Sequence, residues 1–404
     1  MIHQLRERPG CMRTFGVEEE LLLVDPDSGQ AVPRALALMD CYRQLLPELV
    51  RNNSADPPLP EFKGSQLATE FQQEQIEIIS RPHSSLAELA ADIRAGRALA
   101  DECAKEVGAR TAALAMAPLP TVPHPAPDER VGIMIARYGL TAREQLTSGC
   151  HVHVSVESDE EGVAVLDRIR IWLPVLGALA SNSPFSQGID TGYASFRGQA
   201  WSRWPSTGPL EIFGSAAAYY RTIEQMLATG VVLDKAMLYF DARLSTNYPT
   251  VEIRVNDVCL DADDTVLIAA LTRALVETAA RDWRSGKAPE PVPVAILRLA
   301  AWQASRWGIE GDLLHPVTAR PCNAFDVIDL LLEHVGEALS ESGDEAQVQR
   351  LFGQLRGRGT GARQQRDALE RTGSLEGVVT EAIRRTHTPS VDVMSAEVGP
   401  TATV

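Results

Sequence analysis

The chain of 404 residues has few cysteines and no excess of positive charge, and both features narrow its class. Its six cysteines form no Cys-x-x-Cys pair and show no spacing typical of a zinc knuckle or a disulfide framework, so we expect a reducing, intracellular setting. The formal net charge of −16 argues against nucleic acid or an anionic membrane as a partner, because both require a basic surface.

Long apolar runs and several catalytic signatures are also missing. Residues 1–10 lack the apolar core of a signal peptide, and no later segment stays apolar for about 18 residues, so we expect a soluble, cytoplasmic protein. No Gly-x-x-x-x-Gly-Lys-Ser/Thr occurs, and residues 357–361 do not follow a predicted strand, which argues against a P-loop. The sequence has no His-Glu-x-x-His, the helical motif that binds the metal in zinc hydrolases, and this argues against that class.

The pattern of predicted strands and helices favours an α+β fold with an antiparallel sheet. Hydrophobic residues make up 45% of the chain, which is enough for one large core. Strands are predicted at 14–25, in the second half of 70–80, at 112–117 and 150–156, and within 241–258. Helices are predicted at 36–50, 85–107, 163–182, 218–229 and 261–284, and over most of 294–385. We expect a single catalytic domain at 1–386 and a mobile tail at 387–404.

The most informative stretch sets three carboxylates, Glu18, Glu19 and Glu20, inside an otherwise apolar strand. Because side chains alternate along a strand, Glu18 and Glu20 share a face and Glu19 points away. A Glu-x-Glu pair is a natural ligand set for Mg²⁺. The alternative is an edge strand with one solvated face. We expect Glu19 to tolerate replacement far better than its neighbours.

Two further polar clusters interrupt predicted strands. Glu70 and Glu77 are seven residues apart, so an unbroken strand would put them on opposite faces, and we expect a bulge or the start of a strand between them. A solvated strand face is the alternative. His151 and His153 share a strand face and could chelate zinc, but no third nitrogen or sulfur ligand is visible.

The last cluster lies on the predicted strand near residue 250. Thr250, Glu252, Arg254 and Asn256 alternate and should share one face. An exposed, salt-bridged face would explain them. Alternatively, the Glu252 and Arg254 pair suits a metal ion held beside a phosphate oxygen.

Seven motifs occur in order from about residue 14 to residue 386. They are Phe15–Glu20, Glu70–Glu77, Ser148–His153, Ser183–Arg197, Pro249–Arg254, Ala301–Pro316 and Gly361–Arg366. Together they resemble the type 2 glutamate-cysteine ligase family, also called YbdK-like carboxylate-amine ligases. That family is related to glutamine synthetase, so the resemblance implies an antiparallel sheet of about six strands, curved into a funnel and covered outside by helices.

The resemblance also implies roles for particular residues. Arg254 matches the arginine beside the γ-phosphate of ATP and forms the catalytic pair with Glu252, while Arg197 and Arg243 are expected to contact phosphate or substrate. Two or three Mg²⁺ ions, with Mn²⁺ as an alternative, are expected to bind the matched ligands Glu18, Glu20, Glu70, Glu77, His151 and Glu252.

The function implied is ATP-dependent ligation of a carboxylate to an amine through an acyl phosphate. The substrates would be small molecules, with the γ-carboxylate of glutamate as donor and cysteine or another amine as acceptor. Specificity is expected in the loops at 118–127 and 183–214, and the long apolar helices leave room for a homodimer. Two alternatives remain, namely a metal-dependent amidohydrolase that uses His151 and His153 and a non-catalytic binding protein on the same fold.

Overall fold

The computed structural model describes residues 12–52 and 65–388, and its centre is an antiparallel sheet built around β1 (Phe15–Val24). The strand order is β2-β3-β1-β5-β9-β8, and β4 pairs with the end of β1 beyond β5. The other strands are β2 (Gln66–Thr69), β3 (Gln75–Ile79), β4 (Arg110–Ala112), β5 (Gly149–Ser155), β8 (Ala242–Leu244) and β9 (Thr250–Asp257). The predicted α+β class and antiparallel sheet are confirmed.

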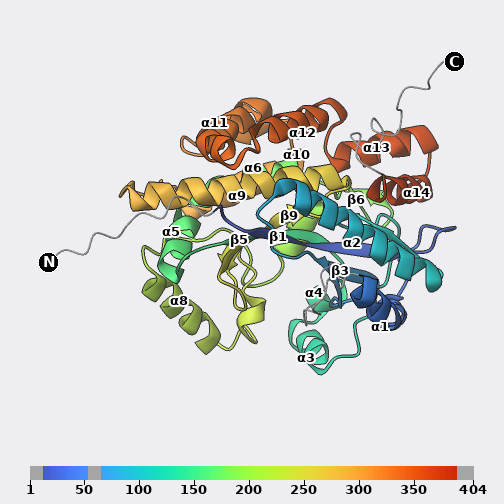
Figure 1. Cartoon of the computed structure of the whole chain (residues 1–404). Helices are drawn as coiled ribbons and strands as arrows, with labels where there is room; N and C mark the ends of the chain where they lie inside the picture. Colours follow the sequence, from blue (N-terminus) through green and yellow to red (C-terminus); the bar gives the residue numbers. More distant parts are fainter. Residues whose placement is uncertain (1–11, 53–64, 389–404) are drawn as a thin grey trace, which may run out of the picture.

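One face of the sheet is apolar and packs against long helices. Val17, Leu21 and Leu23 of β1 are buried, and α2 (Leu86–Glu106) and α9 (Ala262–Arg284) lie across this face (Figure 1). Each such side chain contributes roughly 1.5–3 kcal/mol when it leaves water. The helix α2 begins as predicted, because the Ser85 side chain accepts a hydrogen bond from the Glu88 backbone N–H.

The helix predicted at 163–182 is two helices, α5 (Asp159–Ile169) and α6 (Leu173–Leu179). Pro174 lies in the first turn of α6, where its missing N–H has no intrahelical partner to lose. In the middle of one long helix the same proline would remove a hydrogen bond. The apolar periodicity was therefore read correctly, but the break at Pro174 was not predicted.

The C-terminal third is largely helical, as predicted, and a hairpin of β10 (Asp312–Leu314) and β11 (Pro321–Asn323) interrupts it. Its helices at 324–342 and 345–358 pack against the outer side of α9 (Figure 1). Its helices are α10 (Val294–Trp307), α11 (Ala324–Ser342), α12 (Glu345–Arg358), α13 (Gly361–Thr372) and α14 (Leu375–Thr386). Beyond Thr388 the expected mobile tail lies outside the described residues.

The remaining elements pack around the sheet and its edges. They are α1 (Ala35–Asn52), α3 (Glu129–Tyr138), α4 (Leu140–Arg143), α7 (Phe196–Trp201), α8 (Ala216–Ala228), the 3₁₀ turn η1 (Lys235–Met237), and the hairpin of β6 (Phe185–Ser186) and β7 (Ile189–Asp190). Over residues 12–52 and 65–388, no helix is both long enough and apolar enough to cross a membrane.

Candidate active site

Polar side chains converge on the sheet face that α2 and α9 leave uncovered. Antiparallel pairing sets Glu20 of β1 opposite Glu77 of β3, and Glu18 of β1 opposite His151 of β5. Glu20 also accepts a hydrogen bond of 2.6 Å from the Gly149 backbone N–H. The prediction that Glu18 and Glu20 share a face is confirmed.

Glu19 points to the opposite face, as alternation predicts. Its contacts there indicate that replacing it would destabilise the protein. Its carboxylate is buried and accepts hydrogen bonds from Arg97 Nη2 at 2.7 Å and Arg97 Nε at 2.9 Å. The Thr265 hydroxyl donates a third bond at 2.6 Å. We therefore correct the expectation that Glu19 tolerates replacement, because losing one partner of a buried ion pair strands the other charge.

A turn separates Glu70 from Glu77. Glu70 directly follows β2, the chain then reverses, and Glu77 lies in the middle of β3, which pairs with β2. The predicted interruption is confirmed, and it is a turn between paired strands rather than a bulge.

Two arginines hold the Glu252 carboxylate. Arg243 of β8 donates from Nε at 2.8 Å and from Nη2 at 3.2 Å, and Arg254 Nη1 donates as well. Planar guanidinium groups match carboxylate and phosphate oxygens, so this arrangement can orient both.

A β-bulge changes the predicted alternation of β9. Cys150 is opposite Asn256 and Val152 is opposite Ile253, so β9 has one residue more than β5 between these pairs. Such a bulge shifts the residues that follow it to the other face. Arg254 therefore faces the site, whereas the fully buried Asn256 does not line it, and the prediction that Asn256 shares the face is wrong.

Both histidines of β5 contact Glu18. His151 Nδ1 lies 3.3 Å and His153 Nε2 lies 3.2 Å from the Glu18 carboxylate oxygens. The Thr250 hydroxyl lies 3.0 Å from His153 Nδ1 and fixes the orientation of that ring.

These side chains line one cavity of about 570 Å³, which we call the carboxylate cavity. It contains every predicted metal ligand together with Arg243 and Arg254. The rest of its wall comes from α3, from the segment around Trp201 and Trp204, and from residues 245–248. The carboxylate cavity is lined by Glu18, Glu20, Glu70, Glu77, His151, His153, Arg243, Glu252 and Arg254, among others.

The crowded carboxylates divide into ionised and protonated groups. Burial raises the pKa of Glu70 to about 8, and the charge of Glu20 adds to the rise. Burial and the charge of Glu70 also raise the pKa of Glu77 well above its usual value. Burial would likewise raise the pKa of Glu252, but Arg254 and Arg243 outweigh it and lower that pKa to about 2. A bound cation would relieve the repulsion that favours protonation of Glu70 and Glu77.

The donor set fits divalent cations. Three groups of side chains have ligand atoms within 4.8 Å of one another, and Glu18 and Glu77 each belong to two of these groups. Most of the donors are carboxylate oxygens, which hard ions such as Mg²⁺ prefer. His153 belongs to one of these groups although it was not among the predicted magnesium ligands. The groups are Glu18, Glu77 and His151; Glu18, His153 and Glu252; and Glu20, Glu70 and Glu77.

The zinc amidohydrolase alternative gains little from this geometry. His151 and His153 contribute to different groups, and each is accompanied by two glutamates. Zinc sites in proteins commonly have several nitrogen or sulfur ligands. The groups that contain His151 or His153 each have one nitrogen ligand and two carboxylate ligands, so they resemble magnesium sites more than zinc sites.

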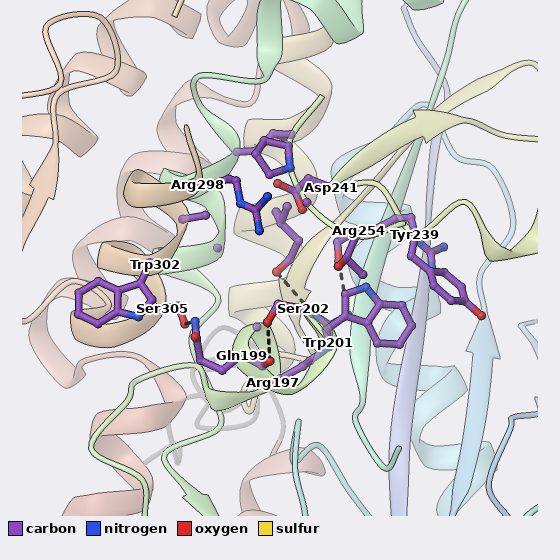
Figure 2. Close-up of a pocket in the computed structure, with 18 of the residues that line it drawn as sticks. Arg197, Gln199, Trp201, Ser202, Tyr239, Asp241, Arg254, Arg298, Trp302 and Ser305 are labelled. Carbon is purple, nitrogen blue, oxygen red and sulfur yellow. Dashed lines mark hydrogen bonds between the residues drawn. The ribbon is translucent and has the colours of Figure 1, made fainter. Parts of the chain in front are cut away.

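A second cavity, of about 530 Å³, adjoins the first, and we call it the adjoining cavity (Figure 2). Trp201, Trp204, Tyr239 and Arg254 line both cavities. Arg197, predicted to contact phosphate or substrate, lines the adjoining cavity and not the carboxylate cavity. The structure thus places Arg197 and Arg243, each predicted to contact phosphate or substrate, in different cavities.

Both loops that were expected to set specificity reach these cavities. Ala126 of the Pro-rich loop lines the carboxylate cavity, and residues 195–209 supply much of the adjoining cavity. Buried Glu74 holds the Pro-rich loop in place, because it accepts a 3.0 Å hydrogen bond from the His124 backbone N–H and contacts His124 Nδ1 at 2.6 Å.

Sequence reasoning missed Asp241 and Arg298, which line the adjoining cavity. Asp241 immediately precedes β8, and its carbonyl accepts a 2.9 Å hydrogen bond from the Arg254 N–H. Its position two residues before Arg243 was the available signal, since alternation puts both on one face. Arg298 lies on an amphipathic helix, where nothing in the pattern distinguishes it from a surface arginine.

Comparison with known proteins agrees with this geometry. Residues 14–388 match the sequence profile of glutamate-cysteine ligase family 2. A Streptomyces avermitilis protein, provisionally named glutamate–cysteine ligase 2-1, is 53% identical over 375 residues, which cover 93% of this chain and 99% of that protein. A Paenarthrobacter aurescens protein with the same provisional name is 50% identical over 377 residues, covering 93% of this chain and 96% of its own.

Solved structures show the same fold at low sequence identity. A Francisella tularensis glutamate–cysteine ligase in complex with AMP has a TM-score of 0.64 and 14% identity, covering 94% of this chain and 89% of its own. A bifunctional glutathione synthetase from Pasteurella multocida has a TM-score of 0.65 and 15% identity, covering 93% of this chain and 52% of its own.

Proposed function

The chain belongs to glutamate-cysteine ligase family 2, and we propose that it joins the γ-carboxylate of glutamate to the amine of cysteine or of another small molecule. It is an ATP-dependent carbon–nitrogen ligase, the class of the glutamate–cysteine ligases. One observation supports the proposed site above all. Five glutamates and His151 surround a single cavity, and two arginines hold one of those glutamates.

The reaction explains why these residue types are needed. A carboxylate and an amine do not condense in water, so ATP first transfers its γ-phosphoryl group to the carboxylate. The amine nitrogen then attacks the acyl carbon, the carbon–oxygen bond to phosphate breaks, and the products are amide, ADP and phosphate. Phosphoryl transfer depends mainly on positioning and on neutralising charge.

The carboxylate cavity would hold the metal ions of this reaction. Glu18, Glu20, Glu70, Glu77, His151 and Glu252 are the proposed ligands of two or three Mg²⁺ ions, with Mn²⁺ as an alternative. When bound, such ions neutralise phosphate charge and orient the triphosphate. The raised pKa values of Glu70 and Glu77 support this assignment, because a cation would relieve the repulsion that raises them.

We assign Arg254 to the transferred phosphoryl group. Its guanidinium is buried and donates to Glu252 through Nη1, while its Nε has no hydrogen-bond partner among the described residues. An unpaired buried donor is costly unless a ligand satisfies it. Arg243 supports the same carboxylate from the other side, and we assign Arg197 to substrate in the adjoining cavity.

The aromatic wall has a proposed role as well. Trp201, Trp204 and Tyr239 stand between the two cavities and pack on one another, with ring centroids 4.8–6.5 Å apart. An acyl phosphate hydrolyses if water reaches it, and a closely packed aromatic wall restricts that access.

The direct test incubates the purified chain with ATP, Mg²⁺, glutamate and a panel of amines that includes cysteine. We expect ADP and a new γ-glutamyl amide in matched amounts, and neither when glutamate or the amine is omitted. Absence of ADP with every acceptor, together with zinc-dependent cleavage of an amide, would instead establish the amidohydrolase.

A further inference from the structure

Residues 183–197, which we call the 183–197 segment, lead into α7 and bring Arg197 to the wall of the adjoining cavity (Figure 2). Within this segment the strands β6 and β7 have two residues each. A two-stranded hairpin on its own is at best marginally stable in water, so one this short does not fix its own position. The place of Arg197 is therefore set by contacts with the rest of the molecule.

Asp257 at the end of β9 holds both ends of the 183–197 segment. Its buried carboxylate accepts hydrogen bonds from the Ser183 hydroxyl at 2.7 Å and from the Ser195 hydroxyl at 2.9 Å. Ser183 Oγ in turn accepts a 3.0 Å bond from the Arg197 backbone N–H, and the Ser195 side chain caps α7. Asp257 thus connects the segment to the strand that carries Arg254.

The Arg197 guanidinium lies close to the sheet. Its Nη1 is 3.9 Å from an Asp257 carboxylate oxygen, and a Cβ on Gly149 would clash with its Nη2. Gly149 is also the residue whose N–H binds Glu20 at the wall of the carboxylate cavity. Since Arg197 Nε has no hydrogen-bond partner among the described residues, a small displacement of this side chain changes what that donor can bind.

The helix α13 contacts the start of the 183–197 segment through Gln365, which belongs to the motif Gly361–Arg366. Buried Gln365 donates from Nε2 to the Asn182 side-chain oxygen at 2.7 Å and to the Asn182 carbonyl at 2.9 Å. The Asn182 N–H donates to Asp257 at 2.8 Å. A Cβ on Gly361 would clash with the Asn182 side chain, so glycine is what allows α13 to approach this closely.

Arg366, the last residue of the same motif, holds the middle of the 183–197 segment. Its guanidinium donates to the two carboxylate oxygens of Asp190 at 2.8 and 2.9 Å, and to the Tyr193 carbonyl at 2.9 Å. Such a bidentate contact fixes orientation as well as distance. The Tyr193 ring contacts Phe196, the first residue of α7, with centroids 5.7 Å apart, so Arg366 also bears on where α7 begins.

We propose that α13 and Asp257 position Arg197 for the substrate that it contacts in the adjoining cavity. Gln365 acts through Asn182, and Arg366 acts on the middle of the 183–197 segment. This inference rests on the proposed ligase function. It goes further because it assigns a positioning role to residues of a helix that lines neither cavity.

The test uses double-mutant cycles with Arg197 in the full chain. Dissociation constants of glutamate and of the accepted amine are measured by calorimetry with Mg²⁺ and with ADP in place of ATP, so that inactive variants can be included. Arg197→Gln first identifies the ligand whose binding depends on that guanidinium. Gln365→Met and Arg366→Met then remove the hydrogen bonds from α13. Arg371→Met, exposed on the same helix and facing Glu381 of α14, is the matched control.

We expect Gln365→Met and Arg366→Met each to raise that dissociation constant about three- to tenfold, as the loss of a well-placed hydrogen bond does. In the Arg197→Gln background neither should raise it further, because a residue that acts through Arg197 then has nothing to position. Asp257→Asn should give the same pattern with a larger increase, and Arg371→Met should leave binding unchanged. Melting temperatures monitor folding, and part-exposed Arg366 tests the proposal without the buried Asp257.

Other results would overturn the proposal. If the increases persist in the Arg197→Gln background, the residues do not act through Arg197 and the proposal is wrong. It is also wrong if Arg197→Gln leaves both dissociation constants unchanged, or if Arg366→Met binds as tightly as Arg371→Met. Turnover of the wild-type chain with ATP is measured separately. If that chain forms neither ADP nor amide, the proposed function itself fails, whereas turnover with additive effects refutes the positioning role alone.

Discussion

Three consecutive glutamates have different roles because their neighbours differ. Glu18 contacts two histidines, and these outweigh burial and hold its pKa below the ordinary value. Glu20 accepts a backbone hydrogen bond at the cavity wall. Glu19 binds Arg97, whose remaining donors bond the Cys259 carbonyl at 2.7 Å and the Leu260 carbonyl at 3.0 Å. Glu19 thus helps to hold β1, α2 and the start of α9 together.

Replacing Glu19 tests that structural role. We expect Glu19→Gln to lower the free energy of unfolding by about 3–5 kcal/mol, because Arg97 stays buried without a counter-charge. Urea denaturation measures the change, and the exposed Glu370→Gln on α13 is the control. A loss below about 1 kcal/mol would show that the pair contributes no more than a surface ion pair.

Replacing Glu20 or Glu252 tests the proposed metal ligands. We expect Glu20→Gln and Glu252→Gln each to reduce ADP formation by about 10²–10³-fold, since a charged ligand at the reacting phosphate is lost. The melting temperature should change little in Glu20→Gln, because the amide oxygen still accepts the Gly149 hydrogen bond, whereas Glu252→Gln should lower it, because buried Arg254 loses its counter-charge. Exposed Glu224→Gln on α8 should behave as wild type. Near-normal rates in both site variants would reject the metal assignment.

At the scale of elements, strand register assembles the site. Residues on β1, β3, β5 and β9 meet because each strand pairs antiparallel with its neighbour, and a slip of β1 by one residue would turn Glu18 and Glu20 toward the core. The close approach of α2 to β3 helps to fix that register. A Cβ on Gly96 of α2 would lie 2.5 Å from Ile78 Cγ2, next to Glu77.

Gly96→Ala tests this contact. An alanine favours a helix over glycine by about 1 kcal/mol, but the clash with Ile78 costs about 1–3 kcal/mol, so we expect net destabilisation. Gly336→Ala in the middle of α11 is the matched control, because an added Cβ there meets no atom within 4 Å and should stabilise the protein. Chemical denaturation measures both. Stabilisation by both substitutions would show that α2 can move away from β3 freely.

Sequence reasoning succeeded where the information was local. Period-two alternation placed Glu18 and Glu20, the capping box located the start of α2, and apolar periodicity located α9. It failed where a distant residue decided the outcome. Arg97 lies 78 residues from Glu19, and the bulge that removes Asn256 from the site depends on pairing with β5. Asp241 drew no attention because the cavity that it lines exists only in the folded protein.

At the scale of the whole molecule, the centre of the sheet carries more negative charge than the metal-free protein can neutralise. The pKa of Glu70 rises from 4.5 to about 8, and that of Glu77 also rises well above its usual value. The folded state thus retains protons that the unfolded chain releases. Stability from these groups is complete below about pH 4.5 and is lost as the pH rises through the folded pKa values.

The pH dependence of unfolding follows from this charge balance. Without divalent ions, we expect the melting temperature to fall between pH 6.5 and 8, above the ordinary histidine pKa of 6.5. Glu252, with a pKa of about 2, stays ionised throughout and contributes no slope. Saturating Mg²⁺ should flatten the fall, and Glu70→Gln should reduce it. A melting temperature that rises with pH in EDTA would contradict the charge balance.

The fold, the family and the cavity together lead to one central claim, that a carboxylate is activated as an acyl phosphate before it forms an amide. The most direct measurement uses glutamate labelled with oxygen-18 in its γ-carboxylate, together with ATP, Mg²⁺ and the amine that the chain accepts. Transfer of one labelled oxygen to inorganic phosphate for each amide formed is the predicted result. Phosphate free of label, despite amide formation, would contradict the claim.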